Sequence, residues 1–259
     1  MSVITRTVRA YPIAFFTLLA CLFGWALFIA AGLGAGGSPS NLPLGPIIAA
    51  AIVAAAMGRA EWRAWGRALI RFRAWWGWYT LAIVAPVVII AVAVLANSAL
   101  GAPLPTPSQL AGWTGLLGSF AFMLLFVGIG EEAGWTAFAA PRLLTRYSFL
   151  TAWVILSIIR SFWHLPLMLT GDLPWVLGIG GNVGFQFLLL WIFLRGGGVW
   201  SIAALWHTVL NTAGGEFIFQ MVQEANQARL GVLMTAGYLL LAAVVYFVDR
   251  RYLVRAHAG

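Results

Sequence analysis

The sequence contains little charge. Only 8% of its 259 residues are charged, and none of them is a lysine. Soluble globular domains carry about 25% charged residues, so an ordinary soluble domain is excluded. Cys21 is the single cysteine, which excludes an intramolecular disulfide. The net charge of +8 comes from arginines that border hydrophobic runs. This distribution is typical of membrane topology signals and does not favour nucleic acid as a partner.

Hydrophobic residues, in contrast, make up 62% of the chain and occur in long runs. Such runs are typical of transmembrane helices, whereas an outer-membrane barrel would show alternating segments of roughly 10 residues. We therefore predict an all-α, polytopic integral membrane helical bundle of about eight transmembrane helices, in one domain over residues 1–259. The first run is too long for a cleaved signal peptide and is expected to stay. The expected spans are 11–34, 44–58, 78–100, 113–140, 148–169, 175–194, 199–219 and 231–248.

The arginines give a test of this arrangement. With the N-terminus in the cytoplasm, thirteen of the fifteen arginines fall in cytoplasmic segments, as the positive-inside rule requires. Arg160 instead falls within a span and Arg229 outside, and the outer loops carry Asp172, Glu216 and Glu224. We therefore expect an integral protein of a bacterial or archaeal cytoplasmic membrane, with both termini cytoplasmic.

The segment "RAEWRAWGRALIRFRAWWGW" (Arg59 to Trp78) has a separate pattern. Its arginines recur every four residues, and its aromatic residues recur at intervals of three and four. On one helix these would form a basic face and an aromatic face, which suits a helix lying at the membrane surface among anionic lipids. We predict an amphipathic interfacial segment over residues 59–77. Docking of a substrate or partner is the alternative.

Ionisable residues inside membrane spans are costly and usually functional. Here they are few, and helical rise places the glutamates and histidines at similar depths in the bilayer, so that they can share one pocket. Asn211 lies one helical turn after a histidine, and Asn182 and Gln186 form another polar pair four residues apart. The ionisable residues are Glu131, Glu132, Arg160, His164 and His207.

Glu131 and Glu132 are expected to do different jobs. Neighbouring side chains on a helix point about 100° apart, which places Trp135 on the face of Glu131 and Thr136 on the face of Glu132. Two adjacent carboxylates in a low dielectric are not both expected to be ionised without a partner. A carboxylate, two histidines and an amide can together hydrolyse a peptide bond: one group takes a proton from water, and others stabilise the oxyanion. Each residue alone can equally be an interhelical hydrogen bond.

Three stretches resemble the motifs of a known family, the CPBP intramembrane proteases (CAAX proteases and bacteriocin-processing enzymes), also called the Abi family. "EEAGWTAFAAPRLL" (Glu131 to Leu144) is similar to the EExxxR motif of the family. "SFWHLPL" (Ser161 to Leu167) is similar to its FxxxH motif, and "GGVWSIAALWHTVLN" (Gly197 to Asn211) resembles its HxxxN motif. The three occur in the order of the family and in the corresponding spans.

This resemblance implies a glutamate-dependent intramembrane endopeptidase with its catalytic core over residues 125–215. Glu131 would activate water, His164 would bind that water and shuttle the proton, and His207 and Asn211 would form the oxyanion hole. Glu132, Arg160 and Trp135 would be supporting residues. The resemblance implies no cofactor and no metal. The substrate would be a membrane-associated peptide or a lipidated protein, as for the type II CAAX prenyl endopeptidase, which removes a C-terminal tripeptide from prenylated proteins.

Two positions depart from the family pattern. The arginine of EExxxR falls on Thr136, and the aromatic residue four positions before His164 falls on Arg160. Arg160 and His164 share a helix face. We therefore hypothesise that Arg160 replaces the missing arginine as the partner of Glu132.

Three other functions remain open at the level of the sequence. A catalytically inactive scaffold or bacteriocin-immunity-type protein would keep the fold and lack proteolysis. A transporter or proton relay also uses buried Glu and His residues, although the chain shows no inverted repeat. A zinc hydrolase is the third, because Glu131, His164 and His207 are potential ligands. The oligomeric state is not predicted.

Overall fold

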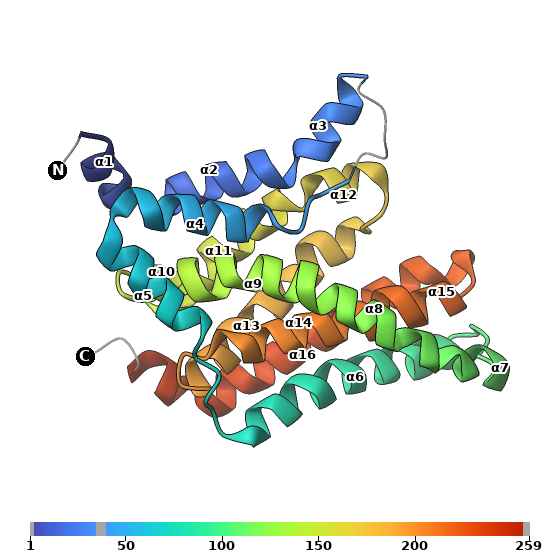
Figure 1. Ribbon diagram of the computed structural model, residues 1–259. Coiled ribbons are helices and arrows are strands. Elements are labelled where there is room, and N and C mark those ends of the chain that lie inside the picture. Colours follow the sequence, from blue (N-terminus) through green and yellow to red (C-terminus); the bar gives the residue numbers. More distant parts are fainter. Residues whose placement is uncertain (1–2, 35–39, 256–259) are drawn as a thin grey trace.

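The computed structural model describes residues 3–34 and 40–255, which form a bundle of helices without strands in these ranges (Figure 1). The ends of the domain predicted over 1–259 lie outside the described residues. The N-terminal part comprises α1 (Val3–Ala10), α2 (Pro12–Gly24), α3 (Ala26–Gly32), α4 (Gly45–Met57), α5 (Arg59–Leu69) and α6 (Trp76–Ala99). The C-terminal part comprises α11 (Phe149–Trp163), α12 (Leu165–Thr170), η4 (Val176–Gly181), α13 (Asn182–Arg195), α14 (Trp200–Leu210), η5 (Asn211–Ile218), α15 (Phe219–Met221) and α16 (Glu224–Arg255).

Between these parts runs one long helical segment, Pro107–Leu144, which carries the two glutamates. Its start is capped by Thr106 and Gln109, each of which bonds to the backbone N–H of the other in a capping box. Along its length the helical winding changes several times. The pieces are α7 (Pro107–Leu110), η1 (Ala111–Gly115), α8 (Leu116–Phe122), η2 (Met123–Ile129), α9 (Gly130–Gly134), η3 (Trp135–Ala139) and α10 (Ala140–Leu144).

The fold class is confirmed, but the number of spans is not. Four helices among the described residues are long and apolar enough to cross a membrane: Trp76–Ala99, Pro107–Leu144, Val176–Arg195 and Glu224–Val254. Helices α2 and α3, bent by 50° relative to each other, make a fifth if they form one span. Helices occupy all eight expected regions. However, α4, with 13 residues, is about 20 Å long, less than the roughly 30 Å of a hydrocarbon core.

The segment predicted over 59–77 is helical only in part. Helix α5 ends at Leu69, and α6 begins at Trp76. Trp65, expected on the membrane-facing side, is instead buried, and its indole N–H donates to the backbone carbonyl of Ala133 in α9 at 3.0 Å. An aromatic face at helical spacing predicts a buried side without specifying whether lipid or protein covers it, so the sequence alone did not reveal this contact. The interfacial role of the segment stays a prediction.

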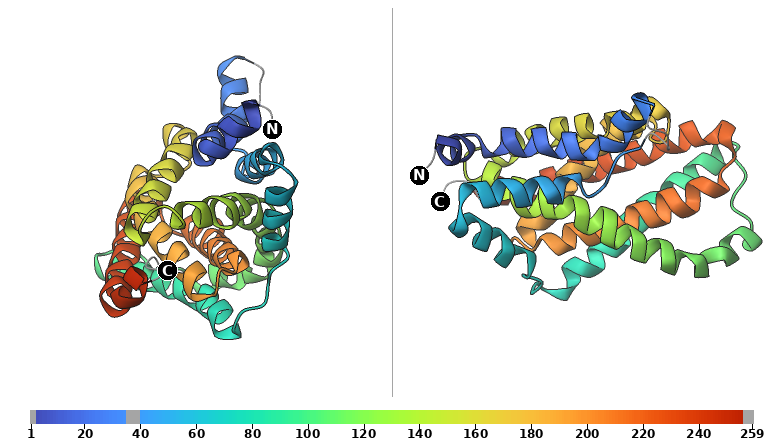
Figure 2. Two further views of the ribbon diagram at one scale, coloured as in Figure 1. Left: turned by 90° about the vertical axis from the view of Figure 1, so that its left-hand side faces the viewer. Right: turned by 45° about the horizontal axis from the view of Figure 1, so that its top comes forward.

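The glutamate-bearing helix α9 lies in the middle of the bundle, between α4 on one side and α14 on the other (Figure 2). Glycines on α9 and on η2, which precedes it, permit close approach to the neighbouring helices. A Cβ at Gly134 would lie 2.6 Å from backbone atoms of Pro46 in α4, and one at Gly128 would lie 2.3 Å from the hydroxyl of Thr208 in α14. Small residues at such contacts let helix backbones pack tightly in membranes. The two glutamates are thereby held between two neighbouring helices.

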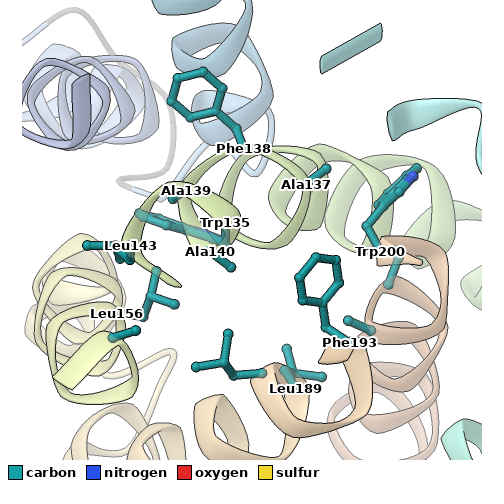
Figure 3. Packing of buried hydrophobic residues seen from close by; sticks show 14 of the residues in the cluster. Trp135, Ala137, Phe138, Ala139, Ala140, Leu143, Leu156, Leu189, Phe193 and Trp200 are labelled. Carbon is teal, nitrogen blue, oxygen red and sulfur yellow. The ribbon is translucent and has the colours of Figure 1, made fainter. Parts of the chain in front are cut away.

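Buried hydrophobic side chains from η3, α10, α11, α13 and α14 pack together (Figure 3). Trp135 is fully buried there and makes an edge contact with Phe16 of α2, with ring centroids 5.0 Å apart. Helices α1 and α5 and the end of α16 lie together at one end of the bundle (Figure 1).

Candidate active site

The two glutamates occupy a short α-helical piece between two π-helical stretches, η2 and η3. π-helical turns are rare and often mark functional sites, because they leave the regular i→i−4 hydrogen-bond pattern. Another π-helical stretch, η5, begins at Asn211, and η4 precedes Asn182. The irregular backbone therefore occurs beside several of the polar residues identified from the sequence.

Arg160 of α11 lies at the centre of the polar cluster and is completely buried. Its Nη2 donates to Oε1 of Glu132 and, at 3.2 Å, to Oε2 of Glu131. The contact with Glu132 is the one expected from the sequence. A guanidinium between two carboxylates compensates the charge that burial would otherwise make very costly.

Glu132 is held by two further residues. The Thr136 hydroxyl donates to its Oε2 at 2.5 Å, and Nδ1 of His207 lies 2.9 Å from its Oε1. Because an ionised carboxylate only accepts, His207 Nδ1 carries the proton and donates it. Glu132 therefore has three side-chain partners, which are Arg160, Thr136 and His207. Glu131 makes the longer contact with Arg160.

Two residues in α13 complete the surroundings of Arg160, and the sequence assigned neither of them a role. The side-chain carbonyl of Gln186 accepts from Nη1 of Arg160 at 3.0 Å, and the guanidinium carbon lies 5.1 Å from the Phe185 ring centroid. The polar pair Asn182 and Gln186 was the available signal for this contact. Asn182 itself donates to the hydroxyl of Ser161 at 2.8 Å.

His164 is the C-cap residue of α11. Among the described residues, it makes no hydrogen bond to either glutamate. Its Nδ1 lies 2.9 Å from the backbone carbonyl of Arg160. A carbonyl oxygen only accepts, so Nδ1 carries the proton and Nε2 has a free lone pair when the ring is neutral. His164 is therefore oriented by the same residue that holds the glutamates.

A cavity of about 430 Å³ reaches this cluster. Three of the four predicted catalytic residues line it: His164, His207 and Asn211. Glu131 is only 3% exposed and is not among the described residues on the cavity wall. The structure thus brings the predicted residues together, but it places Glu131 beside Arg160, behind the wall formed by the histidines and Asn211.

Single ligand atoms of Glu131, Glu132 and His207 lie within 4.8 Å of one another, close enough to hold a metal ion. Nη2 of Arg160, however, already contacts Oε2 of Glu131, Oε1 of Glu132 and, at 3.2 Å, Nδ1 of His207. A divalent cation at this position would lie beside a buried positive charge that repels it. The donor set therefore fits a guanidinium better than a metal.

Comparison with known proteins gives two matches. Residues 112–213 match the model of the type II CAAX prenyl endopeptidase Rce1-like family. The chain is also similar to CAAX prenyl protease 2 of Methanococcus maripaludis, with 24% identity over 140 residues. These two matches support the resemblance to the CPBP family. The alignment covers 49% of this chain and 48% of the relative, so the chain spans about half the length of the curated relative that it matches. The matched residues include both glutamates and Arg160. They also include the three motif residues on the cavity wall, His164, His207 and Asn211.

The hydroxyl of Thr136 provides a local test of the cluster. Thr136→Val keeps the side-chain shape and removes a donor to a buried carboxylate, so we expect a loss of about 1.5–3 kcal/mol in the free energy of unfolding. Thr212→Val is the matched control, because the Thr212 hydroxyl is also buried but has no hydrogen-bond partner among the described residues. Thermal unfolding of both variants in detergent, compared with the wild-type protein, measures the difference. Equal effects would mean that the Thr136 bond contributes nothing.

Proposed function

We propose that the protein is an intramembrane endopeptidase that hydrolyses a peptide bond of a membrane-associated substrate. One observation carries the proposal: a cavity lined by His164, His207 and Asn211 lies directly against a buried cluster of two carboxylates and a guanidinium. Such a cavity offers room for an extended peptide and for water. The names of the family model and of the matched relative agree with this class of reaction.

Two carboxylates and one guanidinium leave the buried cluster with one negative charge that the guanidinium does not compensate. The proposed scheme uses Glu131 in its ionised form, as the acceptor of a proton from water. It uses His207 as a hydrogen-bond donor, with Nδ1–H toward Glu132 and Nε2–H toward the cavity.

The proposed reaction begins with a water molecule held by Nε2 of His164. Glu131, which does not line the cavity in this structure, would have to come within hydrogen-bond reach of this water. It would then take a proton from the water while the water oxygen attacks the carbonyl carbon of the peptide bond. The electron pair of the C=O double bond moves onto oxygen, and this oxyanion accepts hydrogen bonds from His207 Nε2–H and from the Asn211 amide.

The intermediate then collapses. The C=O double bond forms again, the C–N bond breaks, and the proton held by Glu131 passes through His164 to the leaving nitrogen. The products are a new carboxyl terminus and a free amine, which together equal the peptide plus one water. Arg160 and Glu132 do not touch the reacting atoms in this scheme; they hold Glu131 and His207 in place, with Trp135 and Phe185 around the guanidinium.

Asn211 gives a test within the oxyanion hole. Asn211→Ala removes one donor, and we expect kcat to fall about 100- to 1,000-fold with little change in KM, since the donor acts mainly in the transition state. The control is Asn226→Ala, which changes an amide that does not line the cavity. Cleavage of a membrane peptide by purified protein in liposomes measures both constants. A change in KM alone would place Asn211 in substrate binding.

The substrate itself can be sought by comparing membranes. Cells that contain the wild-type protein should lose one or more membrane proteins or gain new protein termini, relative to cells that contain Glu131→Gln. Quantitative proteomics of termini detects both changes. Identical terminal profiles would contradict the proposed activity.

A further inference from the structure

The cavity opens toward one end of the helical bundle. Its inner wall consists of buried or half-buried residues, His164, His207 and Asn211, whereas Gly171, Asp172 and Gln220 on its rim are exposed. The rim residues belong to the connection after α12 and to α15, which lie at the same end of the bundle (Figure 1). The cavity therefore leads from the buried cluster toward this end.

The arginines lie at the opposite end. Arg9 at the end of α1 donates to the carbonyl of Met57, Arg142 of α10 pairs with Glu61 of α5 at 2.6 Å, and Arg195 of α13 pairs with Asp249. The elements α1, α5 and α10 and the end of α16 gather at that end (Figure 1). The arginines on or next to these elements include Arg6, Arg9, Arg59, Arg63, Arg67, Arg142, Arg146, Arg195, Arg250 and Arg251.

Charge near the rim has the opposite sign. Asp172, Glu216 and Glu224 are exposed at the end where the cavity begins. Arg229 is an exception on that side, and its guanidinium donates to side-chain oxygens of Asn97 and Asn226. Short segments rich in arginine stay in the cytoplasm during membrane insertion. The distribution therefore orients the arginine-rich end toward the cytoplasm and the rim of the cavity away from it.

We propose that the substrate enters this cavity from the extracytoplasmic side of the membrane. The class of substrate is then a polypeptide segment of an exported or membrane-inserted protein that is exposed on that side, rather than a cytoplasmic lipidated tail. The water needed for hydrolysis would then also reach the cavity from the extracytoplasmic side, although a cavity open to the cytoplasm is what the sequence had led us to expect. This inference concerns the substrate of the proposed function, but the orientation of the cavity can be tested without any activity.

The single cysteine makes an orientation experiment direct. Cys21 is buried, and Cys21→Ala gives a background without cysteine. Into it we would introduce Asp172→Cys or Gln220→Cys on the rim, and Arg63→Cys on the exposed side of α5 as the matched control. A membrane-impermeant maleimide is applied to intact cells and, in parallel, to permeabilised cells. Two rim positions are used so that the experiment can still be interpreted if one of the two variants does not fold.

We expect both rim cysteines to be labelled in intact cells as fully as after permeabilisation. Arg63→Cys should be labelled only after permeabilisation. The reverse pattern would overturn the proposal, and so would equal labelling of rim and α5 in intact cells, because the protein would then lack one fixed orientation.

A second experiment separates access from activity. One candidate peptide segment is fused to a membrane anchor so that it is exposed either outside or inside the cell. We expect cleavage only of the outside fusion, by the wild-type protein and not by Glu131→Gln. Cleavage of the inside fusion would overturn the inference while leaving the proteolytic function intact. Cleavage of neither fusion, together with the expected labelling, would contradict the proposed function and leave the orientation of the cavity standing.

Discussion

Glu131→Gln should abolish proteolysis while the protein still folds. Glutamine has the same shape but cannot take a proton from water, and loss of a general base typically lowers the rate about 100- to 10,000-fold. The fold should persist because Arg160 keeps its contacts with Glu132 and Gln186. The measurement is the rate of cleavage of a membrane peptide by the variant in liposomes, together with its thermal unfolding in detergent.

The control for this variant is Glu61→Gln, which changes a half-exposed glutamate of α5 at the arginine-rich end of the bundle, away from the cavity. It should leave the cleavage rate unchanged, and it should lower the unfolding temperature little, since its ion pair with Arg142 is partly exposed. Undiminished cleavage by Glu131→Gln would refute the assignment of the base. Because Glu131 lies behind the wall of the cavity, that result would direct attention to His207, whose ring is on the wall and is oriented by Glu132.

Arg160→Phe should be the most destabilising single substitution in the cluster. It leaves two carboxylates buried without their cation, and breaking a buried ion pair in this way costs about 3–5 kcal/mol. Thr136→Arg alone should also destabilise, since it adds a second buried guanidinium. The double variant should recover much of the loss, because Thr136 already contacts Glu132 and an arginine there can use the space that Arg160 leaves.

The thermal unfolding of the two single variants and the double variant forms a double-mutant cycle. A favourable coupling between positions 136 and 160, with cleavage restored in the double variant, would establish that Arg160 replaces the family arginine. Additive losses would show that the two positions act independently. Arg160→Lys is informative as well: a point charge keeps the ion pair but loses the forked contact with both Glu132 and Gln186, so an intermediate effect is expected.

Some features of the cluster follow from helical periodicity alone. Thr136 lies four residues after Glu132, and the structure joins the two by a hydrogen bond. The membrane class follows from composition, since so little charge and such long apolar runs cannot fold as a soluble domain. Hydropathy was less useful for counting spans, because short and bent helices such as α2, α3 and α4 are apolar without being long enough by themselves to cross a bilayer.

Contacts between distant helices were harder to predict. Gln186 accepts from Arg160 across 26 positions of sequence, and Trp65 donates to Ala133 across 68. A helical pattern states which residues share a face, but not which neighbouring helix covers that face. For the same reason the sequence suggested that Glu131 faces the reaction pocket, whereas the structure buries it beside Arg160.

The sequence by itself determined the class of protein, a resemblance to one family, and most of the residues that meet in the polar cluster. These depend on composition, on short motifs and on spacing along one helix, all of which are local. Only the tertiary structure decided that Arg160 bridges both glutamates, that α5 packs on the glutamate-bearing helix α9, and that the cavity leads away from the arginine-rich end. These depend on how closely helices approach one another, which is set by glycines such as Gly128 and Gly134 and by the packing of the whole bundle.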